Sequence, residues 1–461
     1  MRSELLHHYP ELWDPLPAYR SYRRDGALRC LDSLETLLRK SGCFPDHADA
    51  FEATVGFVER AFAAYRGGAG GEAGALDWAF VVPSRMADGD ALHVDEFSDF
   101  LPLLHPRFGA DAWVVRRLLS LLPPALLCRY EGGSWAGGVV LAPVNGGLAA
   151  DVGQQRVRSA AQAVAQDTAE FCRSALGATV VGLGATLPGL TDFGRSIAVP
   201  GLVTTTGHGG TVELIRALAR DVVQKRFVNE SLAVGVVGAA GSIGASILDA
   251  LRREFPDVPI LACDRPSRLG RVERVAARTG VAGRVRVTDR VGEVFASCRL
   301  VVSAITERLD LERVAAGVDL AGTVLIDDSQ PGCVDRTQWE ERGGVLLWPV
   351  GSTAHVPGVP RRGAGYRYGA LAGLAEPHDV WGCEAEAAAI ALTGAHDAAL
   401  RGPVTAAAGG RIGALCEAVG VRAARPQSFG RPARLPARVL HEAEPDHASP
   451  SVVKGKDSAR P

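Results

Sequence analysis

Lysine is nearly absent from this chain, and the patterns that would indicate several other protein classes are absent as well. Only Lys40, Lys225, Lys454 and Lys456 occur among the 461 residues, so arginine supplies almost all of the positive charge. The net charge of −2 gives no electrostatic reason to expect binding to nucleic acid. The nine cysteines include no Cys-x-x-Cys pair, so neither a zinc site nor a disulfide framework is indicated.

Features of exported and membrane-spanning proteins are also missing. The first residues, MRSELLHHYPELWD, contain no apolar signal core. No segment approaches the ~20 uninterrupted apolar residues that a membrane span needs. We therefore expect a cytoplasmic protein with reduced thiols. The length of 461 residues and the hydrophobic content of 47% are sufficient for two or three globular domains.

The most informative segment, residues 232–244, reads LAVGVVGAAGSIG and places three glycines between an apolar run and a helical pattern. Gly238 permits a tight turn, Gly241 lets the backbone approach a pyrophosphate, and Gly244 lets the helix pack closely on the strand. This GxxGxxG spacing predicts dinucleotide binding, and an ordinary strand–turn–helix is the alternative. The other loop residues expected to contact the cofactor are Ala239, Ser242 and Ile243.

Strand and helix patterns alternate regularly after this loop. Short apolar runs predict strands at 233–237, 260–263, 285–287, 300–304, 323–327 and 344–348. Strands that alternate with helices form parallel sheets covered on both faces, so we predict an α/β protein with a Rossmann-type sheet. Ser303, Ala304 and Thr306 follow the fourth strand and are expected to line the cofactor ribose and nicotinamide.

Other segments complete the predicted organisation. Helical spacing occurs at 33–40, 50–65, 112–122, 154–176, 211–226, 383–392 and 406–419, a Gly/Ala tract at 67–74, and strands at 135–143, 178–187 and 202–210. We divide the chain into a helical N-terminal region (1–135), an α/β substrate domain (136–230), a Rossmann dinucleotide-binding domain (231–365), returning helices (366–421) and a tail (422–461). The tail is expected to be disordered after about Pro432. The active site is expected between the substrate and Rossmann domains.

Several segments between Arg156 and Gly420 together resemble the cyanobacterial-type long-chain acyl-[acyl carrier protein] reductases, which form fatty aldehydes. In order, they are VRSAAQAVAQDTAEFCRSALGATVVGLGATLPGL, VTTTGHGGTV, VVGAAGSIG, VLIDDSQPG, GSTAHV and WGCEAEAAAIAL. The resemblance implies a reductase that uses NADPH and an acyl carrier protein partner. It also implies that a cysteine in a Glu-His-Cys turn attacks the acyl thioester.

The reactive turn departs from that family. It reads Ala354-His355-Val356, and valine has no lone pair with which to accept an acyl group. His355 itself follows a predicted strand, where open parallel sheets bind their ligands, so we expect it to handle a proton near the nicotinamide. The alternative is a turn histidine bonded to the backbone.

The second departure concerns cofactor choice. Asp264 stands about 20 residues after Gly244, where the family has an arginine for the 2′-phosphate of NADPH. A carboxylate there accepts a hydrogen bond from a free ribose 2′-OH and repels a 2′-phosphate. We therefore favour NAD, while the neighbouring Arg265 and Arg268 keep NADP open.

Further polar residues are candidates for the site, each with a structural alternative. His208 would contact substrate or the carboxamide, or lie near a helix N-cap, and Cys383 would be a substitute nucleophile or a packing residue. Glu386 is interpreted as a buried, paired carboxylate, with a solvated helix residue as the alternative. The remaining candidates either bind a substrate hydroxyl or amine or cap turns: Thr205, Thr206, Asp327 and Asp328. No third ligand accompanies the two aspartates, so we predict no metal.

Three functional hypotheses follow. The leading one is a nicotinamide-dependent oxidoreductase that transfers hydride directly to or from a small-molecule carbonyl, imine or alcohol, without an acyl-enzyme, in a biosynthetic pathway. The second is a thioester reductase that forms a fatty aldehyde from an acyl carrier protein or CoA thioester. The third is a non-catalytic dinucleotide-binding scaffold. The N-terminal region would serve as a lid, a carrier-protein docking surface or a homo-oligomer interface.

Overall fold

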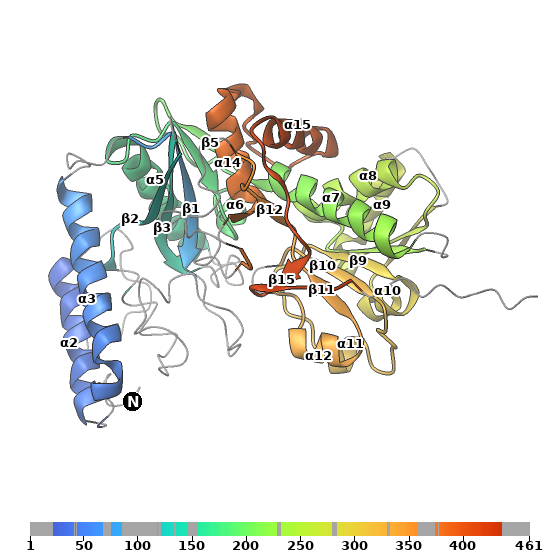
Figure 1. The fold of residues 1–461 in the computed structure, drawn as a ribbon, viewed down its shortest axis with the longest axis horizontal. Helices are drawn as coiled ribbons and strands as arrows, with labels where there is room; N and C mark the ends of the chain where they lie inside the picture. The colour runs from blue at the N-terminus through green and yellow to red at the C-terminus, as the bar shows by residue number, and fades with distance from the viewer. Residues whose placement is uncertain are drawn as a thin grey trace, which may run out of the picture.

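Two sheet-centred lobes lie side by side in the computed structural model of the chain (Figure 1). It describes residues 22–40, 42, 44–67, 75–84, 118, 121–132, 135–145, 155–227, 232–278, 284–329, 332–356, 374–376 and 378–435. The Gly/Ala tract after residue 67, most of the predicted helix at 112–122 and the tail beyond residue 435 lie outside this part. None of the described helices has the length and apolar character that a membrane crossing requires.

A helical hairpin lies at the outer edge of the first lobe (Figure 1). It consists of α2 (Arg24–Lys40) and α3 (Phe44–Gly67), which confirm the two helices predicted at 33–40 and 50–65 and extend both. The buried face of α3 includes Phe57, Val58 and Phe62, which join the core beneath the first sheet.

The first lobe is built on a five-stranded sheet of order β2-β3-β1-β4-β5. Its strands are β1 (Trp78–Ser84), β2 (Ala125–Gly132), β3 (Trp135–Asn145), β4 (Val180–Leu183) and β5 (Val203–Thr205). All pairs are parallel except β2 with β3. The prediction of a helical region up to residue 135 is therefore wrong for β1 and β2. The reason is that WAFVVPS is buried on both faces, and a short apolar run of that kind has no diagnostic period.

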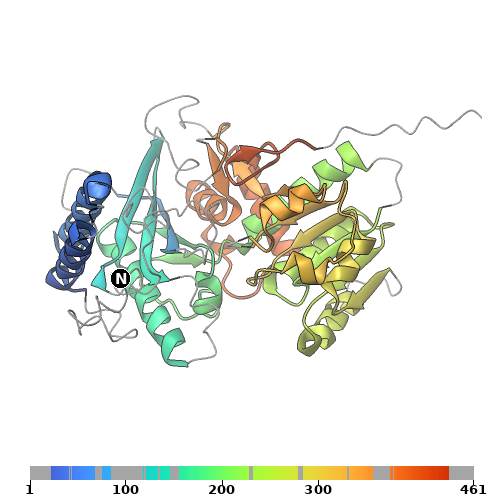
Figure 2. The same cartoon turned by 90° about the horizontal axis from the view of Figure 1, so that it is seen from below.

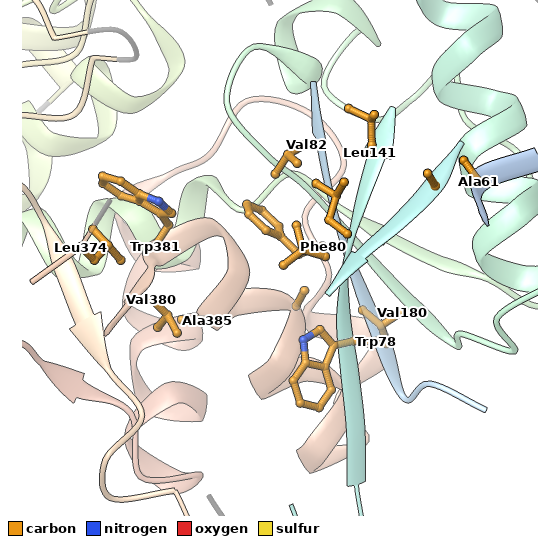
Figure 3. Packing of buried hydrophobic residues seen from close by; sticks show 14 of the residues in the cluster. Ala61, Trp78, Phe80, Val82, Leu141, Val180, Leu374, Val380, Trp381 and Ala385 are labelled. Atoms are coloured by element: carbon orange, nitrogen blue, oxygen red, sulfur yellow. The ribbon is translucent and has the colours of Figure 1, made fainter. Parts of the chain in front are cut away.

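Side chains of β1 alternate between the two faces of this sheet. Ala79 and Val81 pack with α5 (Gln155–Ser174), whereas Trp78, Phe80 and Val82 belong to the core on the opposite face. Figure 3 shows Phe80 directed from β1 toward the side on which Trp381 lies. The first sheet thus presents aromatic side chains toward the second lobe.

The second lobe contains a six-stranded, fully parallel sheet of order β11-β10-β9-β6-β7-β8. This is the Rossmann strand order, in which the chain reverses direction across the sheet between β6 and β9. All six strands predicted from the sequence are confirmed: β6 (Val234–Val237), β7 (Ile260–Cys263), β8 (Val285–Thr288), β9 (Leu300–Ser303), β10 (Val324–Asp327) and β11 (Val345–Leu347).

Helices cover both faces of the second sheet. One face packs against α7 (His208–Arg226), α8 (Ser242–Glu254) and α9 (Leu269–Arg278), with the short helix η5 (Pro266–Arg268) before α9. The other face packs against α10 (Val291–Ser297), α11 (Leu311–Val314) and α12 (Arg336–Glu341). The predicted arrangement of a parallel sheet between two helical layers is therefore confirmed.

After β11 the chain returns to the first lobe. Strand β12 (Val350–Ser352) pairs antiparallel with β13 (Asp379–Trp381) and β14 (Arg422–Ala423). Helix α14 (Gly382–Thr393) lies between the two sheets in both views, and α15 (Ala406–Ala418) packs on α7 (Figures 1 and 2). These confirm the predicted returning helices.

The start of the predicted tail is ordered into short strands. In addition to β14, β15 (Gln427–Ser428) pairs with β16 (Arg431–Pro432), and Trp348 donates its backbone N–H to the Gln427 carbonyl. The boundary placed at residue 422 is therefore wrong, because these residues complete two sheets rather than begin a tail.

Candidate functional site

The glycine loop lies at the point where the strand order of the second sheet reverses. Gly238 follows β6 with a φ of +85°, and a Cβ atom there would lie 2.6 Å from the Ala304 carbonyl oxygen. A Cβ atom on Gly244 would lie 2.1 Å from the Gly238 carbonyl oxygen. Both positions therefore require glycine, the first for turn geometry and the second for close packing of α8 on the loop.

The first turn of α8 opens from this loop without a cap. Its N-cap residue is Gly241, and no side chain accepts a hydrogen bond there. The first backbone N–H groups of a helix lack partners within the helix, and its dipole places partial positive charge at the same end. This arrangement fits the pyrophosphate of a dinucleotide.

Asp264 lies beside the same loop, at the end of β7. Its Oδ2 accepts a hydrogen bond from the Ala240 N–H at 2.7 Å, and its Oδ1 accepts one from the Arg265 N–H at 2.8 Å. Remaining lone pairs on both oxygens can accept ribose hydroxyls. Arg265 is exposed and pairs with Glu307 at 3.0 Å, and Arg268 is exposed on η5.

A cavity of about 530 Å³ extends from the glycine loop to the first lobe. Among the predicted cofactor residues, it is lined by Gly238, Gly241, Ser242, Ile243, Asp264, Arg265, Arg268, Ala304 and Thr306. Across from them, α6 (Leu187–Leu190) and the first sheet supply an apolar wall that contains Phe80, Val82, Leu183, Pro188, Leu190 and Phe193. The predicted position between the two lobes is thus the position of the cavity.

Three of the predicted cofactor residues lie behind the cavity wall. Ala239 is buried and its N–H donates to the Cys263 carbonyl, while Gly244 packs on Gly238. The Ser303 hydroxyl is buried 3.4 Å from that of Ser329. Gly244 has the packing role predicted for it, whereas the prediction that the side chains of Ala239 and Ser303 reach the cofactor is wrong, because they support the loop and the strand end from beneath.

His208 lies in the first turn of α7 and faces the cavity. Its Nδ1 is 3.2 Å from the hydroxyl oxygen of Ser242, which also accepts a hydrogen bond from the Val404 N–H at 3.0 Å. The ring of Phe193 meets the imidazole edge-on, with ring centroids 5.9 Å apart. Desolvation lowers the pKa of His208 from 6.5 to about 4, and the adjoining positive helix ends disfavour a cation too. The imidazole is therefore neutral at pH 7.

A buried carboxylate holds the beginning of α7 in place. Glu386 of α14 accepts hydrogen bonds from the Gly207 N–H at 3.2 Å, the Gly210 N–H at 2.9 Å and the Thr205 hydroxyl. Burial raises the pKa of Glu386, and these hydrogen bonds counter that rise. The interpretation of Glu386 as a buried, paired carboxylate is confirmed.

The two threonines before α7 have different roles. The Thr205 hydroxyl donates to Glu386 and accepts from the Leu400 N–H at 2.9 Å, and it does not line the cavity. Its predicted contact with substrate is therefore wrong, because the protein already uses this hydroxyl. Thr206 does line the cavity, and its hydroxyl oxygen accepts from the His208 N–H at 3.4 Å.

Cys383 lines the cavity from the first turn of α14, close to His208. A Cβ atom on Gly207 would lie 2.3 Å from the Cβ of Cys383, and one on Gly210 would lie 2.0 Å from the Gly382 carbonyl oxygen. Glycines at these positions let the starts of α7 and α14 touch. The structure thereby brings together two of the three predicted catalytic residues, Cys383 and His208.

The third, His355, lies elsewhere. It is exposed, and it is absent from the residues that line the cavity. Strand β12 pairs antiparallel with β13 and β14, so the turn after it is not at the carboxyl edge of the Rossmann sheet. Here the backbone of His355 packs against Gly420, where a Cβ atom would lie 2.4 Å from the His355 carbonyl oxygen. The predicted position of His355 beside the cofactor is therefore wrong.

The two aspartates after β10 also separate. Asp327 is fully buried, and its carboxylate accepts from the Ser329 N–H at 3.0 Å and the Cys333 N–H at 2.7 Å. It therefore shapes the loop, and the prediction that it binds substrate is wrong. Asp328 lines the cavity. No cluster of three His, Cys, Asp or Glu side chains suited to a metal ion occurs in the described part of the chain.

The apolar wall was not predicted from the sequence. Ala185, Asp192 and Phe193, on either side of α6, have φ values of 48°, 51° and 54°. Side chains other than glycine seldom adopt this region, and such residues concentrate at functional sites. No local pattern signals them, because the strain is set by packing.

No family model and no curated protein matches the chain. Among solved structures it is similar to one of the subunits of dipicolinate synthase from Bacillus halodurans, with 16% identity, 36% of this chain and 56% of that chain covered, and a TM-score of 0.26. It is also similar to L-tryptophan dehydrogenase from Nostoc punctiforme, with 10% identity, 74% and 80% covered, and a TM-score of 0.29. A third is 2-hydroxyacid dehydrogenase from Ketogulonicigenium vulgare Y25, with 14% identity, 41% and 63% covered, and a TM-score of 0.25.

At such TM-scores a shared activity does not follow. The chain spans 56% of the length of the dipicolinate synthase protein that it matches. The resemblance to acyl reductases stays a prediction.

Proposed function

We propose that this protein is a nicotinamide-dependent oxidoreductase that transfers hydride directly to or from a carbonyl, imine or alcohol carbon. The observation that carries the proposal is that the uncapped start of α8, after the glycine loop, opens into the same cavity as His208. The dinucleotide site and the apolar wall beside His208, where a substrate would bind, therefore belong to the same cavity.

The residues present fit a dinucleotide along its length. Asp264 would hold the adenosine ribose, the first turn of α8 the pyrophosphate, and the segment after β9, with Ala304 and Thr306, the nicotinamide end. When bound, the cofactor would supply or accept the hydride. The Asp264 carboxylate beside the loop favours NAD, because it can accept a hydrogen bond from a free ribose 2′-OH and would repel a 2′-phosphate.

The substrate side of the cavity carries no charged side chain among the residues that the structure describes. Those that line it from the first lobe, α7 and α14 include no Asp, Glu, Lys or Arg. The neutral His208 is positioned to donate a hydrogen bond to a substrate oxygen through Nε2–H, with Nδ1 accepting from the Ser242 hydroxyl. We therefore favour substrates whose reacting carbon is attached to an apolar group rather than to a carboxylate.

Thioester reduction is the second candidate, and the position of Cys383 favours it. A thiol in the first turn of a helix is stabilised as thiolate by the helix dipole. In this version Cys383 Sγ bonds to the acyl carbon as the bond to the carrier sulfur breaks, and the carrier leaves as a thiol. Hydride then releases the aldehyde and restores Cys383. Stoichiometric aldehyde from an acyl thioester, lost in Cys383→Ala, would support this version.

The proposed function is tested by titrating the protein with NADH and NADPH while following nicotinamide fluorescence. We expect NADH binding that is weakened about 100-fold or more in Gly241→Asp, because the new carboxylate would face the pyrophosphate. Gly410→Asp, in an open position on α15, is the matched control and should bind as the wild type does. Preference for NADPH would overturn the choice of NAD. Binding of neither would overturn the proposed function.

A further inference from the structure

One acidic side chain in the cavity has no role in the function proposed above. Asp328 directly follows β10, on the nicotinamide side of the sheet, and lines the cavity while half-buried. Within the described residues, no hydrogen bond or ion pair engages its carboxyl group. A carboxyl group held in a cavity without a partner is available to a ligand.

Burial first, and the neighbouring carboxylate second, disfavour the charged form of Asp328. Asp327 receives two backbone N–H hydrogen bonds, and such donors stabilise its charged form. Burial raises the pKa of both groups, and at Asp328, where no donor opposes it, burial and the Asp327 charge raise the pKa well above its usual range. Of the two neighbouring carboxyl groups, Asp328 is therefore the one that binds a proton more readily.

Among the described residues, no arginine or histidine forms an ion pair or hydrogen bond with the Asp328 carboxyl group. Arg265 pairs with Glu307, Asp264 is bonded to the glycine loop, and His208 is neutral. The titratable and charged groups that line the cavity or lie directly behind it are His208, Asp264, Arg265, Arg268, Asp289, Glu307, Cys383, Asp327 and Cys333.

The remaining candidates for a proton donor are weaker. His355 is exposed and outside the cavity wall. His208 has a pKa of about 4, so at pH 7 it carries no second proton to give. Its role is then to orient and polarise the substrate oxygen, and a different group must move the proton.

We propose that Asp328 is the proton donor and acceptor of this site. The proposal rests on the proposed function. In reduction, the reduced cofactor would supply the hydride, so its C–H bond breaks as a C–H bond forms at the carbonyl carbon; the π pair moves to the oxygen, and the proton of the Asp328 carboxylic acid forms the O–H bond. Asp328 is left as a carboxylate and regains a proton from water. In oxidation, that carboxylate removes the hydroxyl proton.

The protonation of Asp328 can be measured without turnover. Infrared spectra of the protein at pH 7 should contain a protonated-carboxyl band that is lost in Asp328→Asn and retained in Asp289→Asn, a carboxylate on the adenosine side of the cavity. A band unchanged by Asp328→Asn would overturn the proposal. If Asp328→Asn does not fold, the spectrum of Asp328→Ser is compared with that of the wild type instead.

Two further measurements separate this inference from the proposed function. Asp328→Asn should bind NADH as the wild type does but lower hydride transfer about 100-fold or more, the scale of a general acid. The wild type should also lose stability relative to Asp328→Asn as pH rises, because the native state holds a proton that the unfolded state releases. Normal transfer by Asp328→Asn would overturn the inference alone, whereas failure of the wild type to bind either cofactor would overturn the proposed function.

Discussion

Helices α7 and α8 begin alike, but among the described residues only the first turn of α7 holds an anion. Each follows a parallel strand, each has glycine at its N-cap, Gly207 or Gly241, and neither has a side-chain cap of its own. At α7 the carboxylate of Glu386 occupies the helix end, whereas no described side chain does so at α8. The same positive helix end is thus neutralised from within in one case and open to a ligand in the other.

The occupied helix end of α7 positions side chains of the site, whereas the open helix end of α8 can bind a ligand. The internal anion fixes α7, and with it His208, against α14 and its Cys383. The open end at α8 has the partial charge and free N–H groups that phosphate requires. His208 joins the two ends through Ser242, the first residue of α8.

Replacing the internal anion should have the largest effect on stability. Glu386→Gln keeps the shape of the side chain but replaces one carboxylate oxygen with an NH₂ group. That NH₂ group must then face a hydrogen-bond donor, either a backbone N–H of the α7 turn or the Thr205 hydroxyl. We expect a loss of about 3 kcal/mol in the free energy of unfolding, since a buried, charge-assisted network is broken. Urea denaturation measures it, with exposed Glu417→Gln as the control. A loss below about 1 kcal/mol would show that Glu386 does not hold the helix end.

Replacing His208, which connects the two helix ends, should have a smaller effect on stability at neutral pH, and this effect depends on pH. The pKa of His208 is lowered to about 4, so the unfolded state binds more protons, and stability rises with pH between about 4 and 6.5. At about 1.4 kcal/mol per pKa unit this contribution is at most about 3.5 kcal/mol, complete above pH 6.5 and lost toward pH 4. His208→Gln should remove that dependence in unfolding curves. Exposed His396→Gln is the control, and equal slopes in the two variants would contradict the assignment.

The smallest effect is expected where the two helix ends meet. Ser242→Ala deprives the Val404 N–H of its acceptor, and we expect a loss of about 1 kcal/mol. Ser246→Ala on the same helix is the matched control, because the buried Ser246 hydroxyl has no hydrogen-bond partner among the described residues. Ser246→Ala should leave stability unchanged or raise it, so equal losses in urea denaturation of the two variants would argue against this contact.

The second lobe could be predicted from the sequence almost completely. Strands such as Val234–Val237 and Val324–Asp327 are continuous apolar runs, and helical patterns separate most of them. The glycine loop is one continuous segment of the chain, so its turn, its close packing and the start of α8 could all be predicted from the sequence. Strand β1 was missed, because its partners β3 and β4 are distant in sequence and its run has no period.

The substrate side of the site was less predictable. His208, Cys383 and Glu386 were each noticed, but their proximity depends on how α14 returns to α7, which no local pattern reveals. His355 was misplaced because the strand before it turns out of the parallel sheet. Asp327 and Asp328 are identical in type and adjacent, and only their hydrogen bonds distinguish a loop former from a cavity residue.

The return of α14 has a consequence for how the chain folds as it is made. The aromatic face of β1, with Trp78 and Phe80, is covered in part by residues of Gly382–Thr393, some 300 positions later in the chain. A nascent chain therefore leaves part of this apolar face uncovered until the six strands of the second sheet have been synthesised. That sheet can then form before the first lobe is closed, and the part of the protein that begins first is among the last to be covered.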